Sequence, residues 1–135
     1  MTKQDYETLA TFRYELRKFL HFSEQAALEN GLASQQYQAL LAIEGYPGRN
    51  RITVGELAEQ LQIAAHSAVG LADRLQATGL IERTPSEEDR RCVLVSLTSR
   101  GRVKLEGLAA IHRIQLRTSG PLLKGLLDRI EGLGS

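Results

Sequence analysis

The fold of this chain is decided by residues 53–101, which read TVGELAEQLQIAAHSAVGLADRLQATGLIERTPSEEDRRCVLVSLTSRG. The stretch opens with Thr53 and Glu56, whose spacing is that of a capping box. In a capping box the hydroxyl and the carboxylate each accept a hydrogen bond from the other residue's backbone N–H, and this starts a helix. We expect the helix to run through Gln60.

A second helix and a hairpin follow in the same stretch. Apolar residues at helical spacing predict a helix from about Ala64 to Ala77, and Gly79 is a typical stop. Residues 81–83 and 92–97 are strand-like and are joined by the polar loop 85–90. Helix, turn, helix and hairpin in this order predict a winged helix-turn-helix, a unit that places one helix in the DNA major groove.

Helices and a short strand are expected before this unit. Periodic apolar residues predict a long helix from Asp5 to about Asn30, with Gly31 as its stop. Ser34 is then expected to cap a helix that runs to about Glu44. Arg51-Ile52 is a candidate short strand.

The chain returns to helix after the hairpin. Val93, Val95 and Leu97 alternate as if to bury one face of a strand. Thr98 or Ser99 is expected to cap a fifth helix that ends near Arg117. Gly120-Pro121 is expected to start a sixth, because proline is favoured in the first helical turn.

These elements predict a mainly α fold, with a three-helix core and a β-hairpin wing flanked by N- and C-terminal dimerisation helices. We expect a single domain over residues 1–135. Within it, residues 34–99 form the DNA-binding lobe, and residues 1–31 and 100–135 form the dimerisation helices.

The terminal helices predict a homodimer, because they carry more apolar side chains than one small domain covers. An isologous dimer would bury these side chains and place two reading helices about one DNA turn, roughly 34 Å, apart. The alternative is a monomer whose terminal helices fold back on the core. The side chains in question are Leu105, Leu108, Ile111, Leu122, Leu123, Leu126, Leu127 and Ile130.

Composition narrows the class of protein. A single cysteine, Cys92, excludes an internal disulfide framework and an all-cysteine zinc site. No apolar run approaches the roughly 18 residues of a membrane span, and no signal peptide is visible, so we expect a cytoplasmic protein with no membrane partner. His21, His66 and His112 lack metal-ligand spacing, and no catalytic constellation is apparent. We therefore expect no metal, no cofactor and no enzymatic activity.

The outward side of the second helix in the unit is the candidate base-reading face. We name His66, Ser67, Val69, Gly70 and Arg74 the reading face. A recognition helix meets base edges with its first turns, and an apolar side chain such as that of Val69 suits a thymine methyl group. The alternative is an ordinary solvated helix face that tolerates a glycine.

The hairpin supplies the other candidate contacts. We name Asp89, Arg90 and Arg91 the wing tip. Residues i and i+2 of a strand point the same way, so Asp89 is expected to hold the Arg91 guanidinium for a narrow minor groove. Arg90 points the other way and suits a phosphate. The alternative is a surface ion pair worth less than about 1 kcal/mol.

The balance of charges in the winged-helix region is also compatible with a different class of protein. Residues 51–102 carry seven arginines and seven acidic residues, although DNA affinity depends on phosphate neutralisation. The alternative to a sequence-specific DNA-binding regulator is therefore a winged-helix module that binds another protein. A steep loss of binding with added salt would distinguish DNA binding from that alternative.

Residues 71–101 resemble the multiple-antibiotic-resistance regulator (MarR) family of bacterial transcription factors. The likeness is carried by Asp73-Arg74-Leu75, by the step from Gly79 to Arg83, by Asp89-Arg90-Arg91 and by Val95-Ser96-Leu97-Thr98. The resemblance implies a homodimer that binds a pseudopalindromic operator in double-stranded DNA. It also implies repression or activation of nearby genes, often relieved by a small phenolic or other aromatic anion, and of the two directions we expect repression.

The resemblance further implies a ligand pocket between the dimer helices and the DNA-binding lobe. By position, its residues would be Phe12, Leu16, Phe19, Tyr37 and Leu41, which equally suit a hydrophobic core. Some members sense oxidants with a cysteine, and Arg91 beside Cys92 would favour a lowered thiol pKa. The more common role for such a cysteine is a small strand residue. The sequence leaves open the operator, the regulated genes, the effector and the direction of regulation.

Overall fold

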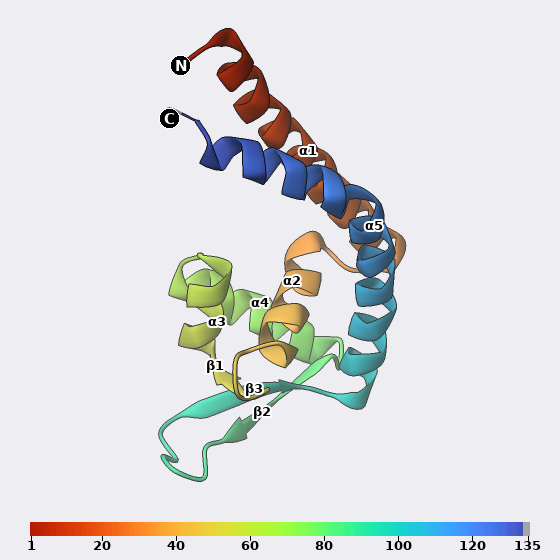
Figure 1. Cartoon of the computed structure of the whole chain (residues 1–135). Coiled ribbons are helices and arrows are strands. Elements are labelled where there is room, and N and C mark those ends of the chain that lie inside the picture. The colour runs from red at the N-terminus through yellow and green to blue at the C-terminus, as the bar shows by residue number, and fades with distance from the viewer. Residues whose placement is uncertain (134–135) are drawn as a thin grey trace.

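The computed structural model describes residues 1–133 and places five helices and three short strands among them (Figure 1). The winged helix occupies the centre of the chain, and the two longest helices extend away from it. In chain order the elements are α1 (Lys3–Glu29), α2 (Ser34–Glu44), β1 (Ile52–Thr53), α3 (Val54–Leu61), α4 (Ala65–Ala77), β2 (Ile81–Pro85), β3 (Val93–Leu97) and α5 (Ser99–Glu131).

Local capping explains where several helices begin. Thr53 Oγ1 accepts from the Glu56 N–H at 3.1 Å, and Glu56 Oε1 accepts from the Thr53 N–H at 3.0 Å. The expected capping box at α3 is therefore confirmed. The predicted cap of α2 is wrong by one residue: Ala33 is the N-cap, and the Gln36 side chain accepts from its N–H at 2.9 Å.

The core lies where α2, α3, α4 and α5 pack against the inner face of the sheet. Its largest fully buried side chains include Leu40, Ile43, Ile52, Leu57, Leu71, Leu75, Ile81, Leu97 and Leu108. Burying each of these side chains contributes roughly 1.5–3 kcal/mol before the cost of conformational entropy. The core therefore fixes α4 against the strands that lead into the wing.

The three strands form an antiparallel sheet in the order β1-β3-β2. Val95 pairs with Ile52 on one side and with Arg83 on the other, and it is buried with Leu97 as predicted. Val93 was expected on the same buried face, but it is 45% exposed. It pairs with Pro85 at the far end of the hairpin, where the strands project beyond the helices (Figure 1).

The predicted break near Gly120-Pro121 is wrong, because α5 continues through Pro121 to Glu131. Proline removes one helical N–H and clashes with the preceding turn, which bends or ends an isolated helix. In this chain α5 bends and then lies beside α1 (Figure 1). Leu126, beyond the proline, is 1% exposed, so tertiary packing outweighs the local helix-breaking signal.

Candidate nucleic-acid interface

The reading face lies on α4, opposite the side that enters the core. Ala68, Leu71, Ala72 and Leu75 are buried. His66, Ser67, Val69 and Arg74 are exposed, and Gly70 is partly exposed. The structure thus brings the five predicted residues together on one surface that nothing else in the described chain covers.

Gly70 determines how this surface is shaped. A Cβ atom at Gly70 would lie 3.4 Å from Arg74 Nη1, so the guanidinium lies across the glycine. Residues i and i+4 are neighbours on a helix surface, which accounts for the contact. The glycine therefore leaves a flat patch beside Val69, with the charge of Arg74 folded over it.

The wing tip is held by hydrogen bonds within a tight turn. The Cys92 N–H donates to the Asp89 carbonyl at 2.9 Å, and the Ser86 N–H donates to the Cys92 carbonyl at 2.9 Å. Asp89 Oδ1 accepts from the Arg91 N–H at 3.0 Å and lies 3.6 Å from Arg91 Nε. Asp89 and Arg91 are thus paired, but through a turn and not through the extended strand that was expected.

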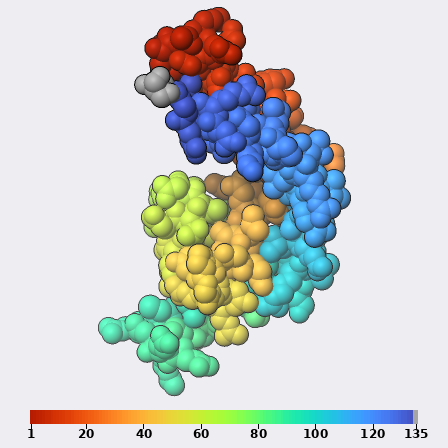
Figure 2. Space-filling view, in the orientation of Figure 1, coloured from red at the N-terminus to blue at the C-terminus, as the bar shows by residue number. Residues whose placement is uncertain are grey.

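The turn presents its arginines to solvent. The Arg91 side chain is 95% exposed even though Asp89 contacts it, and Arg90 is also exposed. The tip projects from the body of the molecule at one end (Figure 2). An arginine side chain at such a position can enter a groove without moving the core.

The environment of Cys92 does not favour a reactive thiolate. Its Sγ lies 3.6 Å from Asp89 Oδ2. The negative charge of Asp89 raises the pKa of the Cys92 thiol, with a smaller contribution from desolvation. The pKa of the thiol is therefore not lowered by Arg91, and the more common of the two roles, a small residue at the wing, is the one that this environment favours.

Arg83 is a residue of this surface whose role the sequence did not reveal. It lies on the inner face of β2 and reaches α4, where its Nη2 donates to Asp73 Oδ1 at 2.9 Å and its Nη1 donates to Gln76 Oε1. The motif that contains Arg83 was visible, but its acceptors lie seven and ten residues earlier, on another element. Arg83 thus joins the wing to the helix that carries the reading face.

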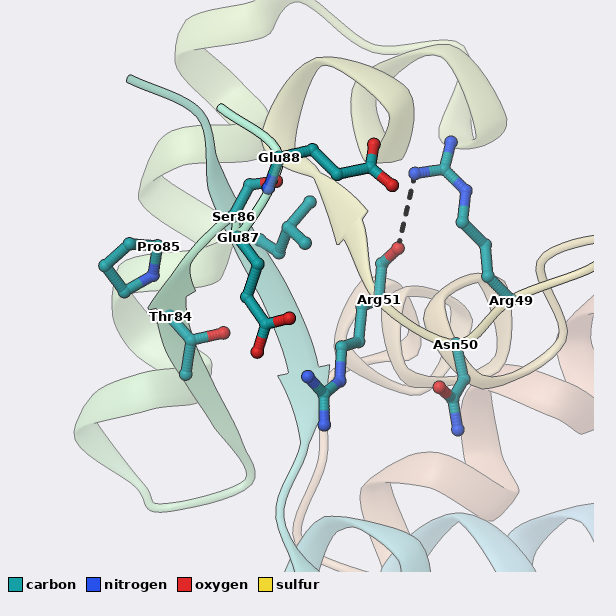
Figure 3. Close-up of a pocket in the computed structure, with 9 residues that line it drawn as sticks. Arg49, Asn50, Arg51, Thr84, Pro85, Ser86, Glu87 and Glu88 are labelled. Atoms are coloured by element: carbon teal, nitrogen blue, oxygen red, sulfur yellow. Dashed lines mark hydrogen bonds between the residues drawn. The ribbon is translucent and has the colours of Figure 1, made fainter. Parts of the chain in front are cut away.

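A polar hollow of about 720 Å³ lies on the outer face of the sheet (Figure 3). Arg49 and Arg51 approach it from the segment before β1, and Glu87 and Glu88 approach it from the wing loop. Leu94 lies in its lining. Because two arginines and two glutamates face this hollow, the outer face of the sheet beside the wing loop is close to neutral.

Arg49 is fixed on the side of this hollow that leads to α3. It pairs with Glu56 and donates from Nη1 to the Arg51 carbonyl at 3.5 Å. The hydrogen bond from the Thr53 N–H is the main cause that lowers the pKa of Glu56, and Tyr46 and Arg49 lower it further. Glu56 therefore stays ionised as a cap and as the counter-charge of Arg49.

A second hollow, which we name the α2–α5 hollow, is open to solvent and has a volume of about 440 Å³. Of the five residues that we expect at a ligand pocket, Tyr37 and Leu41 line this hollow, and Phe12, Leu16 and Phe19 do not. These three lie on α1, and Leu16 is 38% exposed. The residues that line the hollow are Tyr37, Leu41, Ala109, His112, Arg113, Leu116 and Arg117.

His112 connects this hollow to α1. It is 6% exposed and stacks on Tyr37, with ring centroids 4.5 Å apart. Its Nδ1–H donates to the Leu108 carbonyl at 2.7 Å, and its Nε2 lies 2.7 Å from the Ser23 hydroxyl. Phe19 contacts the same imidazole edge-on at 6.1 Å. Sequence spacing alone could not reveal this cluster, because its members lie on three helices.

Two further observations on residues 1–133 bear on other classes of protein. This part of the chain shows no group of three or more His, Cys, Asp or Glu side chains arranged to hold a metal ion. No helix within that range is both long enough and apolar enough to cross a membrane.

Comparison with known proteins agrees with this geometry. The model of the MarR family matches residues 30–91. The transcriptional activatory protein BadR of Rhodopseudomonas palustris is 35% identical over 97 residues, which are 71% of this chain and 55% of that protein. The chain spans about half the length of the curated relatives it matches.

Solved structures share the fold. The MarR family transcriptional regulator AbsC of Streptomyces coelicolor superposes with a TM-score of 0.78 at 21% identity, over 99% of this chain and 92% of that one. A mutant of MepR from S. aureus, bound to an oligodeoxyribonucleotide, superposes with a TM-score of 0.69 at 18% identity, over 91% and 94% of the two chains. These likenesses establish a winged helix with long terminal helices.

Proposed function

The chain belongs to the MarR family, and on that premise we propose that it is a sequence-specific transcriptional regulator that binds a pseudopalindromic operator as a homodimer. The observation that carries the proposal is that the reading face is exposed on α4 while Arg91 is exposed at the hydrogen-bonded wing tip, and Arg83 of the wing strand β2 is bonded to α4. α4 suits the major groove, and Arg91 suits the adjacent minor groove. Repression is the proposed direction, and a reporter assay decides it.

Residues 34–99 are proposed to bind DNA. The first turn of α4 supports this, because its N-cap Ala64 offers no side-chain acceptor and leaves N–H groups free for a phosphate. His66 and Ser67 follow at once and are exposed. Arg90 and Arg91 add positive charge where the tip would meet the backbone.

Residues 1–31 and 100–135 are proposed to form the dimer. Leu105, Leu108 and Leu126 are already buried within the chain, so they do not need a partner. Other apolar side chains on α1 and α5 remain exposed, and a second copy would cover them: Tyr6, Tyr14, Leu16, Leu20, Ile111, Ile114, Leu116, Leu122 and Leu127. An isologous dimer brings the same surfaces together twice.

A small aromatic anion is proposed as the effector that releases DNA. The α2–α5 hollow joins an apolar floor to Arg113 and Arg117, which can bind a carboxylate or phenolate. The chain as a whole carries a net charge of +1, but α5 alone carries seven basic and three acidic side chains. The excess of positive charge thus lies along α5, which contributes Arg113 and Arg117 to the hollow, and not in residues 34–99.

The test is selection of bound fragments from the source genome, followed by fluorescence anisotropy on the best fragment. We expect one pseudopalindrome that binds tightly and weakens steeply with salt. Arg91→Ala should weaken binding by about 1–3 kcal/mol, as expected for an arginine used in readout. Unchanged affinity of this variant would remove the wing from the mechanism. A panel of aromatic carboxylates, titrated into the complex, tests the effector.

One observation favours a second candidate, a protein-interaction module. Residues 34–99 carry six arginines and eight acidic residues, so the lobe as a whole is weakly negative. Failure to enrich any fragment, or weak binding indifferent to sequence, would favour this candidate over the regulator.

A further inference from the structure

Arg83 connects two parts of the proposed DNA-binding surface, the helix α4 and the strand β2 of the wing. It extends from the middle of β2, where it pairs with Val95 of β3. Its guanidinium donates to Asp73 and Gln76, three residues apart and therefore on one face of α4. The Arg83 side chain is 23% exposed, so its stem is largely packed between the strand and the helix.

The two bonds restrict how α4 can turn relative to the wing. A guanidinium is planar and presents its donors in a rigid fork, so two acceptors on it define an orientation as well as a distance. Arg74, the last residue of the reading face, directly follows Asp73 in the chain. A rotation of α4 about its axis would therefore break both bonds and displace the reading face together.

The ion pair between Arg83 and Asp73 also neutralises a carboxylate that lies beside the reading face. The Asp73 side chain is 62% exposed beside the reading face, where an unpaired carboxylate would repel DNA phosphates. Arg83 supplies the opposite charge from beneath the helix. It can do so without leaving its place in the sheet, because its stem already spans the gap between β2 and α4.

We propose that Arg83 is a positioning residue for DNA readout, which fixes the angle between the reading face and the wing tip through Asp73 and Gln76. This inference rests on the proposed function. It differs from a purely stabilising role in that Arg83 makes the major-groove and minor-groove contacts depend on one another.

The first test needs no DNA. Spin labels on the native, exposed Cys92 and on Ala65→Cys report the distance between the wing and α4 by double electron–electron resonance. Arg83→Met should broaden the distribution of the shortest distance between the two labels. Arg83→Lys keeps the charge but not the forked guanidinium, so it should broaden this distribution less. Gln76→Ala removes one acceptor from an exposed helix position and replaces Arg83→Met if that variant does not fold. A distribution as narrow as in the parent protein would overturn the proposal.

The second test uses the duplex selected from the genome and a double-mutant cycle. Arg91→Ala should weaken binding about 10- to 100-fold in the parent background. In the Arg83→Met background, Arg91→Ala should weaken binding by less than about threefold, because the wing is then no longer aligned with α4. Equal costs in both backgrounds would overturn the proposal.

The matched control is Arg102→Met, which breaks a comparable exposed ion pair with Glu44 away from α4 and the wing. It should leave both the distance distribution and the cost of Arg91→Ala unchanged. If the parent protein selects no duplex, the proposed function fails, while the distance measurement still decides whether Arg83 aligns the wing with α4.

Discussion

At the scale of single residues, the junction between the hairpin and α5 depends on a close backbone approach and on two hydrogen bonds of one side chain. Gly101 lies in the first turn of α5, directly against the Leu80 backbone, at the point where the wing returns to the helical body. Thr98 Oγ1 donates to the Gly79 carbonyl at 2.6 Å and accepts from the Gly101 N–H at 3.0 Å. This junction sets the angle between the hairpin and α5.

Gly101→Ala should destabilise the fold. Its Cβ would lie 2.0 Å from the Leu80 carbonyl oxygen and 3.0 Å from the carbonyl carbon, and neither backbone atom can move without shifting β2. We expect a loss of about 1–3 kcal/mol or more in the free energy of unfolding, measured with urea. Gly107→Ala on the same helix is the control, because nothing lies within 4 Å of its Cβ position. The free energy of unfolding of Gly107→Ala should rise by up to about 1 kcal/mol, because alanine favours the helix more than glycine does. Equal stability of the two variants would contradict the expectation.

Cys92 should react slowly with alkylating agents near neutral pH. The charge of Asp89 raises the pKa of the thiol, so the reactive thiolate appears only at higher pH. Asp89→Asn removes that charge and should shift the pH profile of iodoacetamide alkylation to lower pH. Glu88→Gln, one residue away in the same loop, is the control. A profile that does not respond to Asp89→Asn would show that the carboxylate does not control the thiol.

At the scale of elements, short-range capping and long-range packing have separate effects. The α3 cap is built within four residues and was predicted correctly. The continuity of α5 depends on its packing beside α1, and the local proline signal predicted the wrong result. Elements of this chain are thus predictable where their stabilising contacts are local in sequence.

The α3 cap should make stability depend on pH in a definite direction. The pKa of Glu56 is lower in the folded state than in the unfolded chain. The ionised carboxylate therefore contributes to the free energy of unfolding at pH values above the ordinary carboxyl pKa, and this contribution is lost as the pH falls through the folded-state pKa. Glu56→Gln should therefore be less stable than the parent protein near pH 7. The difference in urea midpoint should shrink as pH falls below about 4.5, the ordinary value. A difference that stays constant from pH 7 to pH 3 would argue against the charged cap.

At the scale of the whole molecule, two regions differ in charge and in exposed apolar surface. Residues 34–99, the proposed DNA-binding lobe, are weakly negative, whereas the terminal helices carry exposed apolar side chains and the excess of positive charge. This division agrees with proposed dimerisation and effector binding away from the reading face. It also places most of the chain's net positive charge outside the lobe that is proposed to bind DNA.

Leu20→Glu should weaken the proposed dimer. Leu20 is 54% exposed on α1, and an isologous interface would bury two of the introduced charges. We expect a cost of about 2 kcal/mol or more, roughly 30-fold in the dissociation constant, by sedimentation velocity. Val103→Glu is the control, since Val103 is 72% exposed on α5 near the lobe. A chain that ends at residue 120 should also be monomeric. A dimer that tolerates both changes would place the interface elsewhere.

The candidate site was predictable only in part. The members of the reading face and the wing tip follow from helix and hairpin patterns, because each set lies within a few residues of the chain. Of the five predicted pocket residues, Tyr37 and Leu41 line the hollow beside α2 and α5, whereas Phe12, Leu16 and Phe19 share the apolar periodicity of α1 without lining it. A role of any of them in ligand binding stays a prediction. Helical spacing identifies an apolar stripe, but it does not show which neighbour the stripe meets.

The sequence by itself determined the order of elements, the capping box at Thr53 and Glu56, and the winged-helix class, because these depend on contacts between residues close in the chain. Only the tertiary structure decided that α5 passes through Pro121, that Arg83 holds α4, and that His112 bonds Ser23 across 89 residues. The physical reason is that burial and pairing depend on which distant surfaces meet. A local pattern can specify that a side chain is apolar or charged, but not which group across the fold it contacts.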